Sequence, residues 1–543
     1  MIWKDKAIYL VMFFALCVFA YMDYRYLDIQ FLGVTGGDEL PEFHQWLTMY
    51  EGFRELNIEK IFRFGFYNYG FGWYLLNLLV TAPFHLLHNT EMAIYAPRVL
   101  NGVFSVACLW MIYKICRLYL PALQAYGIVF LVVLMPGFWS NGYLVKPDVF
   151  QAFFILWGVY LLARDNFGFG KAYLGSVFVF GLAVGVAKFQ AVMFFPLLYA
   201  YVLVPYLRGI FDFKKFFIHC VGITASVMAL WVITNPYLLH PRGMGAWWGM
   251  FVFNMESNAT NHGAYTHVSL AEKIFGVIDF YYFEIIVFIV LLCVCLALLW
   301  GFISKISRQK EAKFCQSDLF VVVGIGFLVS LVYLLFGVNK VWGNYYVSTI
   351  YLGVLLFIPM VQYPKIPRFV LPVLLVLQII GGGGSNHGYE QVFKKYDKDL
   401  SDVYAKSTGL VEMLEPIVQY LRSDNQTIEI LTDFASFEYQ KLGLKSVNIH
   451  QMFGSITPDR ISQEAFLKQS NSKNLAFFVP IDVIVFSKDN VFFSQEIPEE
   501  KREETKDSLD TIEALNKGAY GFKKTAESKD FIIYSKDSEM PSE

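Results

Sequence analysis

Residues 280–303 read FYYFEIIVFIVLLCVCLALLWGFI, with Glu284 as the only charged residue. A transmembrane helix needs about 20 mostly apolar residues, so this stretch predicts one spanning helix. Comparable stretches lie on both sides of it, at 7–23, 96–117, 121–138, 148–163, 172–187, 189–206, 216–234, 318–336, 344–361 and 367–381. The sequence therefore predicts a polytopic α-helical membrane protein with about 11 spanning helices.

The overall composition agrees with a membrane protein. Of the 543 residues, 56% are hydrophobic and 17% are charged, whereas soluble proteins carry about a quarter charged residues. The formal net charge is -2. A nucleic-acid partner would require a basic face, so the charge argues against this class of partner.

Basic residues mark one side of the predicted membrane. With the N-terminus in the cytoplasm, every inner loop carries lysine or arginine, as the positive-inside rule requires. If a further apolar stretch at 69–88 also spanned the membrane, every later loop would lie on the opposite side. The basic loops would then no longer all face the cytoplasm. We therefore predict that 69–88 is an interfacial segment, and that the two long loops, 24–95 and 235–279, lie outside.

The stretch GGGGSNHG at 381–388 predicts a flexible hinge between two parts of the chain. Beyond it, a helix-like segment (DLSDVYAKSTGLVEMLEPIVQYL) precedes short strand-like ones (TIEILT, SVNIHQMF, NLAFFVP, DVIVFS and DFIIYSK). This alternation is typical of a small α/β domain. We predict a membrane domain over 1–384 and a soluble α/β domain over 385–543 on the outer side.

Carboxylates beside the predicted helices are candidates for chemistry, because charged groups are costly there. Asp38 and Glu39 follow a Gly-Gly turn soon after the first helix, and Asp148 lies behind Lys146 and Pro147 where the fourth begins. Such a group could act as a general base or bind a metal ion, so a divalent cofactor is left open. Each could instead cap the helix that follows it.

Three cations lie near predicted outer helix ends, namely Arg98, Lys188 and Lys340. A phosphate at the membrane surface requires such fixed charges. The alternative for each is a side chain that snorkels to the interface.

The second outer loop adds Arg242, Trp247, Trp248 and His262. The two tryptophans could stack on a sugar or anchor the interface. The histidines of this loop lack the spacing of a metalloprotease-type zinc site.

Five short motifs, taken in order, resemble the GT-C superfamily. Within it they are most similar to the group of protein O-mannosyltransferases and bacterial aminoarabinose transferases of lipid A. The motifs are GDE at 37–39, YAPRVLNG at 95–102, MPGFWSNGYLVKPD at 135–148, GLAVGVAK at 181–188 and NYYVSTIYLG at 344–353.

The resemblance implies roles for individual residues. Asp38 would be the general base, with Glu39 beside it, and Asp148 would help to organise the site. Arg98 and Lys188 would hold the phosphate of the donor. The other candidates for donor phosphate or substrate are Lys340, Arg242, Arg63, Lys146, Trp247, His262 and Tyr345.

The implied activity is inverting transfer of a sugar from a polyprenyl-phosphate donor to an acceptor hydroxyl. The acceptor would be lipid A, a surface glycan, a lipid or a protein on the periplasmic side of a bacterial inner membrane. Interfacial helices are expected at 42–56 and 69–88. A flippase for lipid-linked sugars and a non-catalytic membrane scaffold are the alternative hypotheses.

Overall fold

The computed structural model forms two compact units. The first comprises Met1–Leu27 and Glu42–Asp397, and the second comprises Asp28–Pro41 and Lys398–Glu543. The structure describes residues 2–24, 39–62, 69–143, 145–260, 267–306, 314, 316–381, 401–421, 427–434, 439–442, 447–451, 456–465, 479–488 and 499–536. The domain boundary predicted at 384–385 lies outside these residues.

The first unit is helical. Its helices are α1 (Ile2–Tyr24), α3 (Glu39–Glu55, which begins in the Asp28–Pro41 segment), α4 (Ile58–Phe62), α5 (Phe71–Leu86), α6 (Thr90–Tyr119), α7 (Ala122–Val133), α8 (Pro136–Tyr143), α9 (Pro147–Asp165), α10 (Lys171–Leu182), α11 (Phe195–Leu207), α12 (Phe213–Thr234), α13 (Pro241–Thr260), α14 (Leu270–Lys273), α15 (Ile285–Ile306), α16 (Gln316–Val332), α17 (Val347–Val354), α18 (Phe357–Gln362) and α19 (Val370–Gly381). Short π or 3₁₀ turns are η1 (Ala183–Ala187), η2 (Phe189–Phe194), η3 (Pro236–Leu239), η4 (Ile274–Tyr282), η5 (Tyr333–Gly337) and η6 (Gly343–Tyr346).

Among the described residues, seven helices are long and apolar enough to cross a membrane. An eighth span results if α7 and α8, which bend by 66° at their junction, are counted together. Two shorter apolar helices cover Lys171–Ala187 and Val370–Gly381. The polytopic helical membrane fold is therefore confirmed, whereas the total of about eleven spans remains a prediction.

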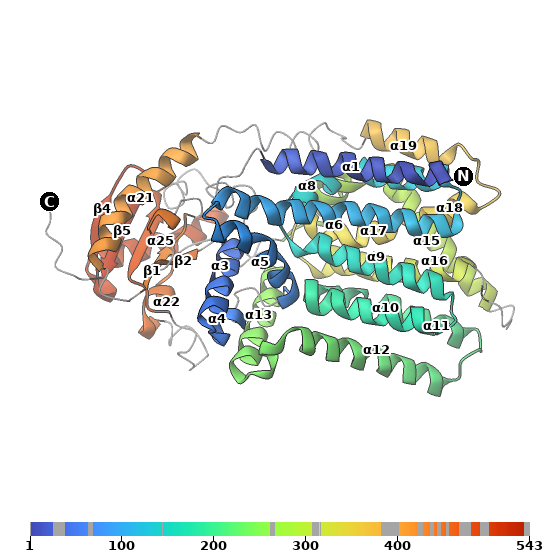
Figure 1. Ribbon diagram of the computed structural model, residues 1–543, viewed down its shortest axis with the longest axis horizontal. Helices are drawn as coiled ribbons and strands as arrows, with labels where there is room; N and C mark the ends of the chain where they lie inside the picture. The colour runs from blue at the N-terminus through green and yellow to red at the C-terminus, as the bar shows by residue number, and fades with distance from the viewer. Residues whose placement is uncertain are drawn as a thin grey trace. The chain divides into compact units, whose positions relative to one another are not determined.

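Figure 1 shows the long helices of the first unit side by side, with α3, α4, α5 and α13 across one end and the N-terminus at the other. Helices α3 and α5 correspond to the interfacial helices expected at 42–56 and 69–88. Helix α5 has 16 residues, which is short for a spanning helix.

Close packing fixes the bent pair of α7 and α8. Every residue of α8 is buried, and a Cβ atom at Gly142 would lie 2.1 Å from Cε1 of Phe19 in α1. Asn101 of α6 donates hydrogen bonds to the carbonyl oxygens of Asn141 and Gly142, at 2.8 and 3.1 Å. These contacts hold the end of α8, and thus the start of α9, in one position.

The second unit contains a five-stranded sheet of order β2-β1-β3-β5-β4. Its strands are β1 (Ile428–Thr432), β2 (Val447–Gln451), β3 (Val483–Ser487), β4 (Phe522–Glu527) and β5 (Phe531–Lys536), and its helices are α21 (Ser401–Leu421), α22 (Pro458–Ile461) and α25 (Glu499–Asn516), with short 3₁₀ turns η7 (Tyr439–Leu442) and η10 (Ala519–Gly521). Strands β2, β1 and β3 are parallel, whereas β5 and β4 pair antiparallel. The C-terminal sheet is therefore confirmed. The strand-like segment NLAFFVP lies mostly outside the described residues.

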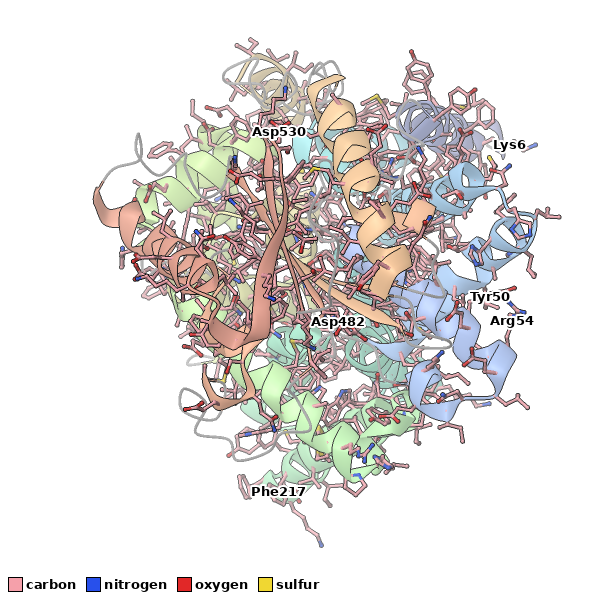
Figure 2. All side chains as sticks on the ribbon, turned by 90° about the vertical axis from the view of Figure 1, so that its left-hand side faces the viewer. Lys6, Tyr50, Arg54, Phe217, Asp482 and Asp530 are labelled. Atoms are coloured by element: carbon pink, nitrogen blue, oxygen red, sulfur yellow. The ribbon has the colours of Figure 1, made fainter. Side chains whose placement is uncertain are left out.

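The antiparallel pairing of β3 and β5 places the residues that precede them at opposite ends of the sheet. Asp482 precedes β3 and Asp530 precedes β5, and both are labelled in Figure 2. The carboxylate of Asp482 accepts hydrogen bonds from the backbone N–H of Glu429 and from Nζ of Lys536, both at 3.0 Å. Asp482 thus ties β1 and β5 to the strand that lies between them.

Candidate active site

Lys188 stands at a break between two apolar helices, as the sequence predicts. Helix α10 continues into the π turn η1, Lys188 itself is extended, and η2 then leads into α11. The backbone of Lys188 forms an isolated antiparallel bridge with Tyr69. Lys188 is only 4% exposed, so its charge requires partners inside the protein.

Asp148 supplies the main partner of Lys188. It lies in the first turn of α9, and its Oδ1 atom is 2.7 Å from Nζ of Lys188. Its Oδ2 atom accepts a hydrogen bond of 3.2 Å from the amide of Asn344. Lys146, and not Asp148, occupies the N-cap position of α9. The described side-chain bonds of Asp148 therefore connect α9 to Lys188 and to Asn344 in η6. The positive end of the α9 dipole also favours a carboxylate here.

Two aromatic rings connect this pair to further lysines. Nζ of Lys188 lies 4.7 Å from the ring centre of Tyr345, and Nζ of Lys340 lies 5.8 Å from the same ring. Trp342 stacks near Tyr345 and has Nζ of Lys146 5.0 Å from its own ring centre. All three lysines are buried, and ring faces stabilise such desolvated cations.

A cavity of about 300 Å³ opens beside Lys188 and Tyr345. Its wall is mostly apolar and contains Trp247, together with the amides of Asn254 and Asn258. The other lining residues are Phe189, Gln190, Val192, Met193, Met250, Phe251, Met255 and Tyr333. An apolar wall with a cation at one edge suits an amphiphile that carries an anionic group.

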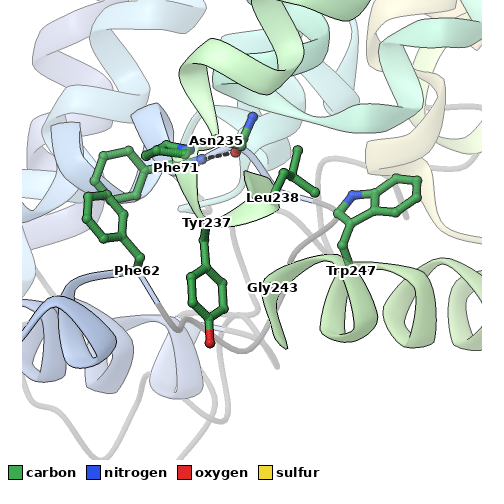
Figure 3. Close-up of a pocket in the computed structure, with 8 residues that line it drawn as sticks. Phe62, Phe71, Asn235, Tyr237, Leu238, Gly243 and Trp247 are labelled. Atoms are coloured by element: carbon green, nitrogen blue, oxygen red, sulfur yellow. Dashed lines mark hydrogen bonds between the residues drawn. The ribbon is translucent and has the colours of Figure 1, made fainter. Parts of the chain in front are cut away.

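A much smaller pocket is also lined by Trp247. Its volume of about 10 Å³ is about the least that can hold one water molecule. Figure 3 shows its lining, with Phe71 and Asn235 on one side and Trp247 on the other, and the hydrogen bond of 2.9 Å from the backbone N–H of Phe71 to Oδ1 of Asn235. The two pockets share Trp247 in their linings.

The remaining predicted residues occupy other positions. Arg98 is buried in α6, one turn before Asn101. Arg242 is the second residue of α13, and its side chain is 70% exposed and lies 3.5 Å from Glu59. Glu39 is buried at the start of α3.

Three predicted residues, Asp38, Arg63 and His262, lie outside the described residues. The segment Asp28–Pro41 groups with the second unit, so the place of Asp38 and Glu39 relative to Asp148 remains a prediction. Among the residues that the structure describes, no group of three or more His, Cys, Asp or Glu side chains could hold a metal ion.

The structure adds residues that the sequence analysis missed, namely Tyr69, Ser257, Trp342 and Asn344. Ser257 accepts a hydrogen bond of 2.8 Å from Nζ of Lys340. Asn344 was visible as the first residue of the motif NYYVSTIYLG, next to the predicted Tyr345. The other three carry no charge and stand in no quoted motif, so nothing in their local sequence distinguished them.

Residues 74–234, which run from α5 to the end of α12, match the sequence model of a family described as dolichyl-phosphate-mannose-protein mannosyltransferase. The match includes Arg98, Asp148 and Lys188. The matched residues are similar to this family, and they form less than a third of the chain. The resemblance drawn from the short motifs is thereby confirmed.

Solved structures similar to the chain include ArnT from Cupriavidus metallidurans bound to undecaprenyl phosphate, at 12% identity and a TM-score of 0.49 over 99% of this chain and 100% of that one. The Archaeoglobus fulgidus oligosaccharyltransferase is 11% identical, with a TM-score of 0.45 over 88% and 68%. Arabinofuranosyltransferase AftD from Mycobacteria is 12% identical, with a TM-score of 0.45 over 96% and 40%. No curated protein sequence matches the chain significantly.

Proposed function

We propose that this protein is a GT-C glycosyltransferase that transfers a sugar from a polyprenyl-phosphate donor to an acceptor hydroxyl. The observation that carries the proposal is the buried ion pair of Lys188 and Asp148 at the edge of the apolar cavity. The family match over 74–234 supports the same reaction class. We place the site on the periplasmic face of a bacterial inner membrane, with the domain over 385–543 on that face.

The charges around Tyr345 favour an anionic ligand. Three buried lysines, Lys146, Lys188 and Lys340, lie against the rings of Trp342 and Tyr345. Lysine ammonium groups are suited to binding a donor phosphate, and the isoprenoid chain would occupy the apolar cavity. Arg98 and Arg242 are proposed as further phosphate contacts, and Trp247 as a contact of the lipid or sugar.

The proposed chemistry is one inverting displacement. The acceptor oxygen forms a bond to the anomeric carbon, and the bond from that carbon to the phosphate oxygen breaks. The acceptor proton passes to the carboxylate of Asp38, with Glu39 as the alternative base. Polyprenyl phosphate leaves with the bonding electrons, and the lysines stabilise the charge that develops on it. Asp148 holds Lys188 in place for this role.

The experiment is transfer of radiolabelled sugar from several polyprenyl-phosphate donors by membranes that contain the wild type, Asp38→Asn or Glu39→Gln at equal expression. Removal of the base should lower transfer by about 10²-fold or more. If Asp38→Asn retains full activity and Glu39→Gln loses it, Glu39 is the base. Absence of transfer from every donor, with movement of intact donor across the membrane, would contradict the proposal and support the flippase hypothesis.

A further inference from the structure

The side chain of Asn235 joins three separate segments at the end of α12. Its Nδ2 group donates hydrogen bonds to the carbonyl oxygens of Gly185, at 2.7 Å, and Trp231, at 2.9 Å. Its Oδ1 atom accepts the backbone N–H of Phe71 at 2.9 Å. Figure 3 shows Asn235 between Phe71 and the wall that contains Trp247. One amide thus connects α12, the π turn η1 and the start of α5.

The segments that Asn235 joins are the two that carry Lys188 and its aromatic neighbour Tyr69. Gly185 lies three residues before Lys188, and Phe71 lies two residues after Tyr69. The backbones of Tyr69 and Lys188 pair directly. Nζ of Lys188 is 5.5 Å from the ring centre of Tyr69. A shift of Gly185 relative to Phe71 would therefore displace the backbone that carries Lys188.

Two glycines make this junction too tight for side chains. A Cβ atom at Gly70 would lie 2.3 Å from the carbonyl oxygen of Gly185, and one at Gly185 would lie 2.2 Å from Oγ1 of Thr234. The N–H of Gly70 donates a hydrogen bond of 2.9 Å to the carbonyl oxygen of Ala187. The backbones of the three segments are therefore in contact, and Asn235 is the side chain that bonds them together.

We infer that Asn235 is a positioning residue that fixes the ammonium of Lys188 against Asp148 and so sets the affinity for the donor phosphate. This inference rests on the proposed function for the role of Lys188 in binding phosphate. An amide is required because the position must donate to Gly185 and accept from Phe71 at the same time. Alanine loses both bonds, and ionised aspartate keeps only the acceptor.

The first measurement is the binding of undecaprenyl phosphate to the purified full chain. Asn235→Ala should weaken binding by about tenfold, the effect of losing one or two hydrogen bonds. In the transfer assay the same change should raise KM for the donor and leave kcat nearly unchanged. Asn89→Ala is the matched control, because Asn89 also bonds a backbone N–H, that of Met92, at the start of α6. It should bind like the wild type.

The Asn235→Asp variant adds a pH-dependent binding measurement. The result should not depend on pH in this way if Asn235 only stabilised the fold. A protonated aspartate has the shape of asparagine and regains a donor for the carbonyl oxygen of Gly185. The ratio of its affinity to that of the wild type should therefore rise several-fold as pH falls from 8 to 5. The ratio for Asn235→Ala should stay flat. His240 and the lysines of the site are present in every variant, so their titration cancels in these ratios.

A second measurement does not depend on donor binding. Lys188 should react slowly with an amine-acylating reagent in the wild type, because it is buried and paired with Asp148. Mass spectrometry should find several-fold faster labelling of Lys188 in Asn235→Ala and unchanged labelling in Asn89→Ala. Unchanged labelling and unchanged binding in both Asn235 variants would overturn the inference. If the wild type does not bind undecaprenyl phosphate, the proposed function fails, and the labelling still decides whether Asn235 positions Lys188.

Discussion

Nζ of Lys188 lies 2.7 Å from Oδ1 of Asp148, although 40 residues separate them in the chain. Both side chains are about 5% exposed or less. Each stands where a helix is interrupted or begins, because Lys188 follows the π turn η1 and Asp148 opens α9. The ion pair therefore links two helix ends that local sequence alone would leave independent.

Removal of one partner of this pair should destabilise the protein strongly. Lys188→Ala leaves the Asp148 carboxylate buried without its main counter-charge, and Asp148→Asn does the same to the ammonium. Each change should cost about 3–5 kcal/mol. Thermal unfolding in detergent, followed for both variants, measures this effect.

The double variant Lys188→Met with Asp148→Leu separates charge from packing. Because no uncompensated charge remains, it should be more stable than either single variant. All three should lose sugar transfer. If the double variant is less stable than both single variants, Lys188 and Asp148 do not compensate each other's buried charge.

A second prediction concerns the contact of α8 with α1. Gly142→Ala would place a methyl group 2.1 Å from Cε1 of Phe19, and overpacking of this kind costs about 1–3 kcal/mol. Gly222→Ala in α12 is the control, because a Cβ atom there has nothing within 4 Å. Comparison of the two midpoints of thermal unfolding tests the prediction. Equal midpoints would mean that α1 moves away from α8 without cost.

A third prediction concerns the wall of the cavity. Trp247 lines it, whereas its neighbour Trp248 is 59% exposed. Trp247→Ala should raise KM by about tenfold for a donor with a full polyprenyl chain, because apolar contact is lost. A donor with a short, water-soluble chain should be affected less. Trp248→Ala is the control, and an equal effect of both changes on both donors would contradict the assignment of the cavity to the lipid chain.

The sequence revealed the charged members of the site, because charge inside apolar segments is conspicuous. Lys188 and Asp148 were identified for this reason, and the structure brings them together. Asn235 was missed because a neutral amide at a helix end is common and has no periodicity. Its partners, Gly185 and Phe71, are 50 and 164 residues away. Contacts of such range depend on the packing of three segments and leave no local pattern.

Secondary structure was also predicted correctly where the sequence has a clear apolar pattern, and it was missed where such a pattern is absent. Long apolar runs such as 280–303 correspond to helices, and the alternating TIEILT and DFIIYSK segments correspond to β1 and β5. Helix α25 was not identified, because its sequence EEKREETKDSLDTIEALN is dominated by charged residues. The π turn η1 was also invisible, since its residues are as apolar as those of α10. Hydrophobic patterning reports burial and does not report the path of the backbone hydrogen bonds.

The last prediction concerns acid sensitivity of the β4–β5 hairpin. Glu527 accepts hydrogen bonds from Nζ of Lys488, at 2.6 Å, and from Nζ of Lys524, at 2.7 Å. The bond from Lys488 has the larger effect, and together the two bonds lower the pKa of Glu527 from 4.5 to about 2. A carboxyl group whose pKa is lower in the folded state stabilises that state above its unfolded pKa, and the contribution is lost as pH falls from 4.5 towards 2.

The size of this effect should be small, because the side chain of Glu527 is 40% exposed and solvent screens exposed pairs. Glu527→Gln should lower the melting temperature of the C-terminal sheet slightly at pH 6, and this difference from the wild type should vanish as the pH approaches 2. Added salt should reduce the difference at pH 6. Glu412→Gln, at an exposed position of α21, is the control and should leave the melting temperature unchanged across this range. A difference between wild type and Glu527→Gln that grows on acidification would have the wrong sign for a carboxylate stabilised by Lys488 and Lys524.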